Sequence, residues 1–154
     1  ATLVPVAFPT WKGDLSIILS AETGAAFDEL TRSHRDELMV QQAKYSWPNF
    51  FRAARFIPAV EYIQANRVRH ELIRQMALVM KDVDVVLCPP FGDNLLTTNL
   101  TGHPSITVPA GFENPTKPAT VVFTGQLYRE GAMLGIAQAF QVATGHHLKH
   151  PPGY

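Results

Sequence analysis

The sequence predicts an α/β protein with a mixed sheet flanked by helices. Three observations predict this class. A long helical pattern begins at Pro58, a β-branched run stops at Pro89-Pro90, and two further β-rich stretches precede an apolar helix at 130–143. Strands that alternate with helices are typical of α/β architecture. Hydrophobic residues form 46% of the 154 residues and charged residues 17%, which supports a packed core and excludes a disordered chain.

The first thirty residues predict a strand and a helix. Residues 2–9 have the pattern of a strand inside a fold, and Gly13 and Asp14 end it. Asp14 is expected to cap a helix that starts near Leu15. Gly24 lies within this helix, where glycine costs about 1 kcal/mol relative to alanine. Its presence there indicates close packing against a neighbouring element.

Three helical segments are expected next. A polar helix is predicted over 36–44 and a short helix or turn over 49–56, with Pro48 breaking the pattern because the residue before a proline avoids the helical conformation. Pro58 suits the first turn of a helix that runs to about Lys81. The apolar stripe of this long helix consists of Ala65, Val68, Leu72, Met76 and Val79.

The second half predicts the sheet. The apolar run at 83–87 should lie inside the sheet, because a strand that is apolar on both faces is typical of a buried position. Pro89 and Pro90 lack backbone donors and must end the ladder. A polar loop is expected over 91–102, with strands at 105–109 and 119–127 and an irregular tail from Gly145 onward.

Charge and composition exclude several classes of protein. Thirteen Lys and Arg balance thirteen Asp and Glu, so the basic footprint of a nucleic-acid-binding protein is absent. Apolar stretches are far shorter than the roughly 20 residues of a membrane span, and no signal-peptide pattern begins the chain. We therefore expect neither a nucleic-acid nor a membrane partner, and a cytoplasmic location.

Motifs for cofactors and metals are missing from the sequence. It has no dinucleotide or P-loop fingerprint, no zinc-protease motif and no nucleophile elbow, so no cofactor is expected. Cys88 is interpreted as a structural cysteine, since the apolar surroundings expected at the end of this strand do not lower the pKa of a thiol. The polar groups interpreted as surface or capping residues rather than as metal ligands or an acid pair are His146, His147, His150, Asp82, Asp84 and Asp93.

Several stretches, taken in order, resemble the C-terminal third of the amidase signature family. They are the segments at 59–69, 82–90 and 98–112, followed by 122–130 and the Ala-rich last helix. The most specific is Asn99-Leu100-Thr101-Gly102-His103-Pro104-Ser105. The resemblance covers nearly the whole chain, and it implies the C-terminal part of the amidase signature fold.

The resemblance also implies an activity for the parent protein. The family hydrolyses or transfers amide groups with two serines and a lysine, and these lie N-terminal to the region matched here. None of the five serines of this chain, at 16, 20, 33, 46 and 105, matches that motif. Residues 1–154 are therefore expected to be a single domain or fragment from the C-terminal region of a longer protein. The chain alone is expected to be inactive.

In the family this region completes the central sheet and lines part of the substrate pocket. Thr98, Asn99, Thr101 and, more weakly, His103 are accordingly predicted to bind a small-molecule amide substrate in the parent protein. The same polar groups could instead satisfy backbone groups of a tight loop. Both interpretations remain open on the sequence.

Three functions are compatible with the residues. The first is the C-terminal part of an amidase-type hydrolase that acts on carbon–nitrogen bonds. The second is a non-catalytic α/β binding module derived from that family, and the third is an interaction domain that pairs with a separate catalytic chain. A fragment of a larger sheet should expose apolar surface or a strand edge. It should therefore pair with its missing N-terminal catalytic region or self-associate.

Overall fold

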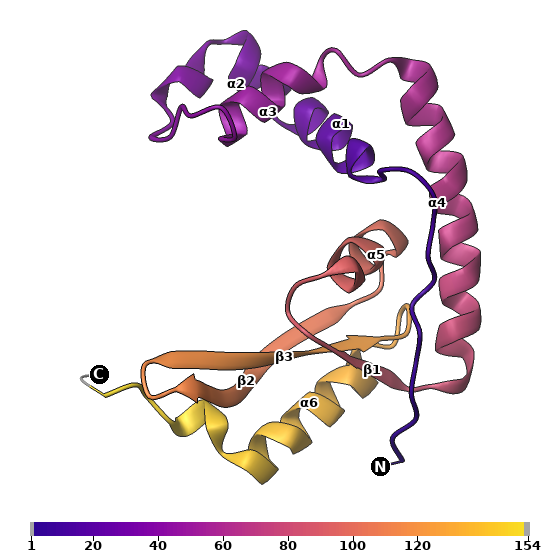
Figure 1. Ribbon diagram of the computed structural model, residues 1–154, viewed down its shortest axis with the longest axis vertical. Helices are drawn as coiled ribbons and strands as arrows, with labels where there is room; N and C mark the ends of the chain where they lie inside the picture. The colour runs from indigo at the N-terminus through magenta and orange to yellow at the C-terminus, as the bar shows by residue number, and fades with distance from the viewer. Residues whose placement is uncertain (1, 153–154) are drawn as a thin grey trace. The chain divides into compact units, whose positions relative to one another are not determined.

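The computed structural model describes residues 2–152, which form two compact units. The first unit contains residues up to Thr10 and from Leu72 onward, and the second contains Trp11–Glu71. The elements, in chain order, are α1 (Ser16–Ala26), α2 (Asp28–Arg32), the 3-10 turn η1 (Arg35–Leu38), α3 (Trp47–Ala54), α4 (Ala59–Val79), the 3-10 turn η2 (Met80–Asp82), β1 (Val85–Cys88), α5 (Asp93–Thr101), β2 (Ser105–Asn114), β3 (Lys117–Gly125), α6 (Glu130–Thr144) and the 3-10 turn η3 (His146–Leu148) (Figure 1).

Helix α1 packs closely against α3 in the second unit. The N-cap position of α1 is Leu15, so the prediction that Asp14 caps this helix is wrong by one residue. Asp14 still accepts a hydrogen bond from the backbone N–H of Ser16, the first residue of the helix, at 2.8 Å. A Cβ atom on Gly24 would overlap the Cβ of Ala54, at a separation that no real pair of carbons tolerates. The close packing expected at Gly24 is therefore confirmed. The rings of Phe27 and Phe51 stack beside this contact, with centroids 4.7 Å apart.

The prediction of a polar helix over 36–44 is wrong. Only the 3-10 turn η1 forms there, because the segment has no apolar stripe and its polar side chains bind its own backbone. Asp36 is 2% exposed and forms an ion pair with Arg52 at 2.5 Å. The side-chain amide of Gln42 donates to the backbone oxygen of Asp36 at 2.8 Å. Helix α3 begins at Trp47, so Pro48 lies in its first turn rather than before it.

The long helix is confirmed as α4 (Ala59–Val79), with the turn η2 completing it. Within the second unit, Glu22 accepts hydrogen bonds from Tyr62 and Arg69, both at 3.3 Å, and these join α1 to α4. Leu72 and Met76 of the expected stripe are buried in the first unit. Among the described residues, no helix is long and apolar enough to cross a membrane.

The sheet of the first unit has the strand order β1-β3-β2. Strands β2 and β3 form a hairpin through Pro115 and Thr116, and β1 pairs with the other side of β3. The α/β class is confirmed, but the three described strands are all antiparallel, whereas a mixed sheet was expected. The prediction that the run at 83–87 lies inside the sheet is also wrong: β3 is central, and β1 is an edge strand of the described sheet, with Leu87 51% exposed.

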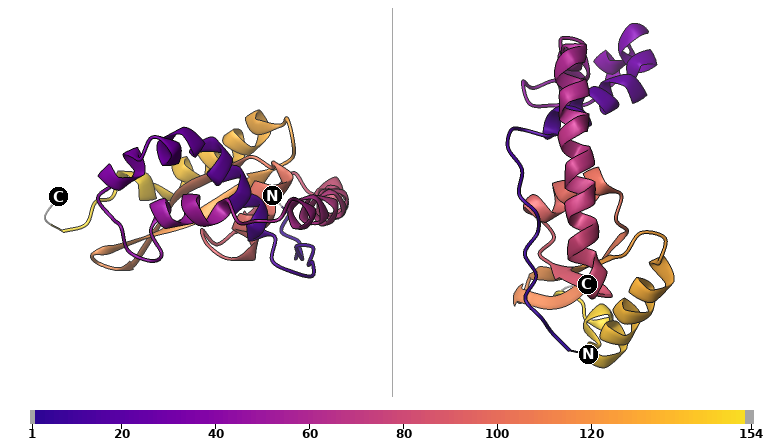
Figure 2. Two further views of the ribbon diagram at one scale, coloured as in Figure 1. Left: turned by 90° about the horizontal axis from the view of Figure 1, so that it is seen from above. Right: turned by 90° about the vertical axis from the view of Figure 1, so that its right-hand side faces the viewer.

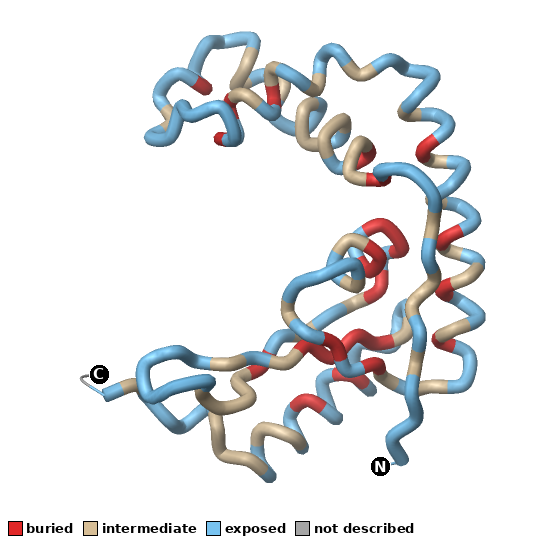
Figure 3. The backbone as a smooth tube through the Cα atoms, in the orientation of Figure 1, coloured by how far each residue is buried: buried red, intermediate tan, exposed pale blue. Residues whose placement is uncertain are grey.

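The two faces of the sheet carry separate apolar clusters. On one face, Met76 and Met80 pack with Val86, Cys88 and Val122. On the other face, Val108 and Phe123 pack with Met133 and Ala137 of α6, which runs along the hairpin (Figures 1 and 2). Buried residues are concentrated in these layers and in α5 (Figure 3). Adjacent residues of β3 point to opposite faces, as a pleated strand requires.

The first residues do not form the expected strand. Residues 2–9 are extended, but they take no part in the ladder of the described strands. Val6 and Phe8 instead pack against the cluster of Met76 and Cys88. The alternation of apolar residues thus serves side-chain packing rather than strand pairing.

Candidate functional site

Helix α5 occupies the segment where the sequence predicts a polar loop over 91–102, so that prediction is wrong. The helix follows Gly92, whose φ of +125° lies outside the range that side chains favour. The side-chain amide of Asn94 donates to the backbone oxygen of Pro89 at 3.0 Å and fixes the turn after β1. Gly102 ends the helix in the left-handed conformation with a φ of +79°.

The hydroxyls of α5 are satisfied within the helix. Thr97 donates to the oxygen of Asp93 at 2.8 Å, Thr98 to that of Leu95 at 3.1 Å, and Thr101 to that of Thr97 at 2.8 Å. Such bonds let threonine enter a helix without losing its hydrogen bond. Thr98 and Thr101 are 4% and 5% exposed.

The structure joins the side chains of two of the four predicted site residues by a hydrogen bond. His103 is buried, and its Nδ1 atom lies 2.8 Å from Oγ1 of Thr101. Burial lowers the pKa of His103, because desolvation disfavours the charged imidazolium. Asn99, in contrast, is an exposed residue of α5. The four positions therefore share one helix end, with only Asn99 on the surface.

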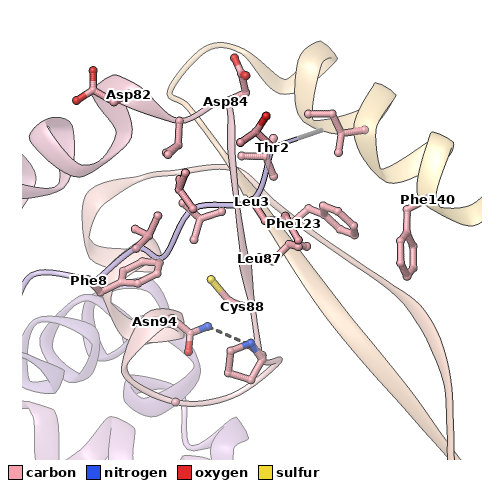
Figure 4. Close-up of a pocket in the computed structure, with 18 of the residues that line it drawn as sticks. Thr2, Leu3, Phe8, Asp82, Asp84, Leu87, Cys88, Asn94, Phe123 and Phe140 are labelled. Atoms are coloured by element: carbon pink, nitrogen blue, oxygen red, sulfur yellow. Dashed lines mark hydrogen bonds between the residues drawn. The ribbon is translucent and has the colours of Figure 1, made fainter.

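The first unit also contains an open groove of about 1330 Å³ along β1 (Figure 4). Its apolar walls come from the first residues, from β1 and β3, and from α6, and they include Leu3, Phe8, Leu87, Phe123 and Phe140. Residues from both faces of β1 contribute, so the groove follows the unpaired side of that strand.

Polar groups enter the groove near the two ends of β1. Asp82 and Asp84 line it before the strand, and Asp93 and Asn94 line it after the strand. The three carboxylates are exposed. Of the segment 91–102, only residues 91–94 line the groove, and none of Thr98, Asn99, Thr101 and His103 is among its described lining residues.

Cys88 lines the groove but is 5% exposed. Burial raises the pKa of its thiol, and a hydrogen bond with Thr124 opposes this only in part. A protonated, buried thiol is a poor nucleophile, which agrees with the structural interpretation. Ser105, the serine nearest to α5 in sequence, shares a hydrogen bond of 2.9 Å with the hydroxyl of Thr124.

The tail histidines are placed separately. The ring of His146 packs on Gly111, where a Cβ atom would lie 3.4 Å from Cε1, and its centroid is 6.5 Å from that of Phe140. His147 and His150 are exposed. Within residues 2–152, no group of three or more His, Cys, Asp or Glu side chains could hold a metal ion.

Sequence reasoning missed two features of this region. One is the groove, which depends on Leu87 being exposed at an edge, and the other is the contact between Thr101 and His103. The second has a signal in the sequence, since glycine after a threonine-rich segment is typical of a helix C-terminus. A helix that ends at Thr101, followed by a turn at Gly102, would have predicted that residues 101 and 103 lie close together.

Relatives in sequence are named as amidases and as one component of an amidotransferase. The protein named as amidase AmiD in Mycobacterium bovis is 31% identical over 119 residues, which cover 62% of this chain and 25% of that protein. The A-subunit of glutamyl-tRNA(Gln) amidotransferase from Burkholderia mallei is 28% identical over 205 aligned positions, which cover 99% of this chain and 40% of that protein. The chain thus spans a quarter to two fifths of these relatives. No protein-family model matches it.

Solved structures show the same fold. A bacterial aryl acylamidase of the amidase signature family superposes with a TM-score of 0.63 at 19% identity, over 92% of this chain and 36% of that one. The resemblance expected from the sequence is therefore confirmed. The chain is a homologue of amidases and of the A-subunits of glutamyl-tRNA(Gln) amidotransferases, and its fold is consistent with the C-terminal portion of an amidase signature enzyme.

Proposed function

We propose that this chain is the C-terminal part of an amidase-type hydrolase that acts on carbon–nitrogen bonds of small amides. It contributes the sheet β1-β3-β2 and part of the substrate pocket. The observation that carries the proposal is the agreement of sequence and fold, since amidases match the chain in both. The chain covers 25% of AmiD and 36% of the aryl acylamidase, which supports a portion of a longer enzyme rather than the whole.

The catalytic serines and lysine of the parent belong to another part of that protein. The parent attacks the amide carbonyl with a serine, forms an acyl-enzyme and releases the acyl group to water. In this chain the thiol of Cys88 is buried and its pKa is raised, so it does not replace the serine. The isolated chain is therefore inactive on amides and esters.

The end of α5 supplies the substrate contacts of this part. Asn99 is exposed, and its side-chain amide can donate to a carbonyl oxygen or accept from an N–H group. Thr98 and Thr101 use their hydroxyl hydrogens on helix carbonyls, which leaves only oxygen lone pairs for a ligand. Among the four predicted residues, Asn99 thus has the largest capacity to orient an amide.

The proposal is tested with the complete reading frame that encodes this chain. We expect its product to release ammonia from benzamide, and a serine-directed fluorophosphonate to abolish the release. Asn99→Ala should lower kcat/KM by about 5- to 150-fold, since an unmade hydrogen bond costs about 1–3 kcal/mol. Gln138→Ala, at an exposed position of α6, is the control and should leave kcat/KM unchanged.

Two results would contradict the proposal. One is hydrolysis by the 154-residue chain alone that the fluorophosphonate blocks. The other is an Asn99→Ala protein that is unstable while its folded fraction keeps full specific activity. The second result would show that Asn99 stabilises the fold around α5 and does not bind the substrate.

The second candidate is a non-catalytic binding or interaction module derived from the amidases. The unpaired side of β1 and the apolar groove beside it favour this function, because such surfaces usually bind another chain. A reading frame that starts near Ala1, with copurification of a second polypeptide, would favour the module over the hydrolase.

A further inference from the structure

The hydroxyl of Thr101 has two neighbours and only one hydrogen. Its Oγ1 atom lies 2.8 Å from the backbone oxygen of Thr97 and 2.8 Å from Nδ1 of His103. A carbonyl oxygen can only accept, so both short contacts can be hydrogen bonds only when the hydroxyl hydrogen points to Thr97. The second contact is a hydrogen bond only if Nδ1 of His103 carries the proton.

The same count of donors and acceptors disfavours the tautomer with its proton on Nε2. With the proton on Nε2, the lone pairs of Nδ1 and Oγ1 would face each other at 2.8 Å unless the hydroxyl left Thr97. Both side chains are buried, at 5% and 8% exposure, so water offers little compensation. The backbone holds the arrangement in place, because the N–H groups of Gly102 and His103 both donate to the oxygen of Thr98, at 2.9 and 3.2 Å.

A histidine with its proton on Nδ1 offers only an acceptor at Nε2. Burial lowers the pKa of this ring, so it is neutral near pH 7 and keeps that acceptor. The natural complement of such an acceptor is an N–H donor, and primary amides carry two.

We propose that Thr101 fixes His103 as the Nδ1–H tautomer, so that Nε2 accepts a hydrogen bond from the N–H of an amide ligand. This inference rests on the proposed function for the class of ligand. The tautomer itself depends only on contacts within residues 97–103. His103 is thereby a binding residue, and Thr101 is the positioning residue that sets its acceptor.

Nuclear magnetic resonance tests the tautomer directly. Long-range ¹H–¹⁵N spectra of the labelled 154-residue chain reveal which ring nitrogen is protonated, and the His103→Asn variant identifies the signals among the six histidines. We expect Nδ1 to be protonated in the wild type and in Thr101→Ser, which keeps the hydroxyl. Thr101→Val should lose this preference. A wild-type ring protonated on Nε2, or an equal mixture of tautomers, would overturn the proposal.

A pair of probes tests the ligand. Benzamide carries N–H donors, whereas methyl benzoate has the same ring and a carbonyl group but no N–H. We expect benzamide, and not methyl benzoate, to move the Nε2 signal saturably in the wild type, with at least a tenfold weaker response in Thr101→Val. An equal response to both probes, or none to either, would overturn the ligand assignment. These readouts need no turnover, so they can fail or succeed independently of hydrolysis by the complete protein.

Discussion

The side-chain amide nitrogen of Gln126 lies 2.8 Å from the backbone oxygen of Val83 and 2.9 Å from that of Met80. One side chain after β3 thus holds the turn η2 and the segment that leads into β1. Backbone carbonyls that are buried without a donor are costly, and a glutamine amide supplies both hydrogens. Gln126 therefore ties the last turn after α4 to the end of the central strand.

Gln126→Glu should destabilise the first unit. The carboxylate cannot donate, and it would face two carbonyl oxygens, so we expect the free energy of unfolding to fall by about 2–3 kcal/mol. Chemical denaturation followed by circular dichroism measures the change. Gln138→Glu, at an exposed position of α6, is the matched control and should shift stability by less than about 0.5 kcal/mol. Equal effects of both substitutions would contradict the bridging role.

Gly24→Ala should destabilise the second unit, because the new methyl group would overlap Ala54. Overpacking of this kind costs about 1–3 kcal/mol, and thermal unfolding measures it. The double variant with Ala54→Gly should recover part of the loss. Gly135→Ala provides the opposite case: no atom lies within 4 Å of its Cβ position in α6, so it should stabilise by about 0.5–1 kcal/mol. If Gly24→Ala were as stabilising as Gly135→Ala, the close contact with Ala54 would be refuted.

The thiol of Cys88 should react slowly with iodoacetamide. Burial raises its pKa, so at pH 8 the thiolate fraction in the folded chain is smaller than in the unfolded chain. The folded protein holds this proton to higher pH than the unfolded one, so this group's contribution to stability falls as the pH rises above the unfolded pKa. We expect alkylation in the folded chain to be at least tenfold slower than in urea and to accelerate with rising pH. Rapid alkylation at pH 7 without denaturant would show a reactive cysteine instead.

The unpaired side of β1 should promote self-association of the isolated chain. Leu87 is 51% exposed there, and a lysine on an edge strand is a common barrier to pairing. Leu87→Lys should therefore shift the chain toward monomer in analytical ultracentrifugation. Leu134→Lys replaces a leucine on α6 that is 48% exposed and should have little effect. A wild-type chain that stays monomeric at high concentration would count against association through this edge.

The sequence predicted those elements whose apolar pattern matches their environment. Helices α4 and α6 have long periodic stripes, and the stretches of β2 and β3 are rich in β-branched residues, so local pattern and tertiary packing agree. Helix α5 was missed because Thr97, Thr98 and Thr101 are common in loops, and their use of helix carbonyls is visible only in three dimensions.

Two other errors have a tertiary origin. The alternation over residues 2–9 is that of a strand, but no described strand pairs with it, and Val6 and Phe8 pack as side chains instead. The apolar run that contains β1 is typical of an internal strand, yet β1 pairs only with β3 among the described strands. Local sequence sets the tendency to extend, whereas pairing depends on residues far along the chain.

The packing of Val6 and Phe8 against the cluster of Met76, Met80, Val86, Cys88 and Val122 has a consequence for the order of folding. During synthesis Val6 and Phe8 leave the ribosome before this cluster is complete, so their side chains lack part of their native packing until β3 has been made. Packing Phe8 against this cluster closes a loop that reaches at least to Met76. Contacts across such long loops form late, because the entropy lost on closing the loop is offset only when neighbouring contacts are already in place. The opening segment should thus be the last part of the first unit to pack during refolding.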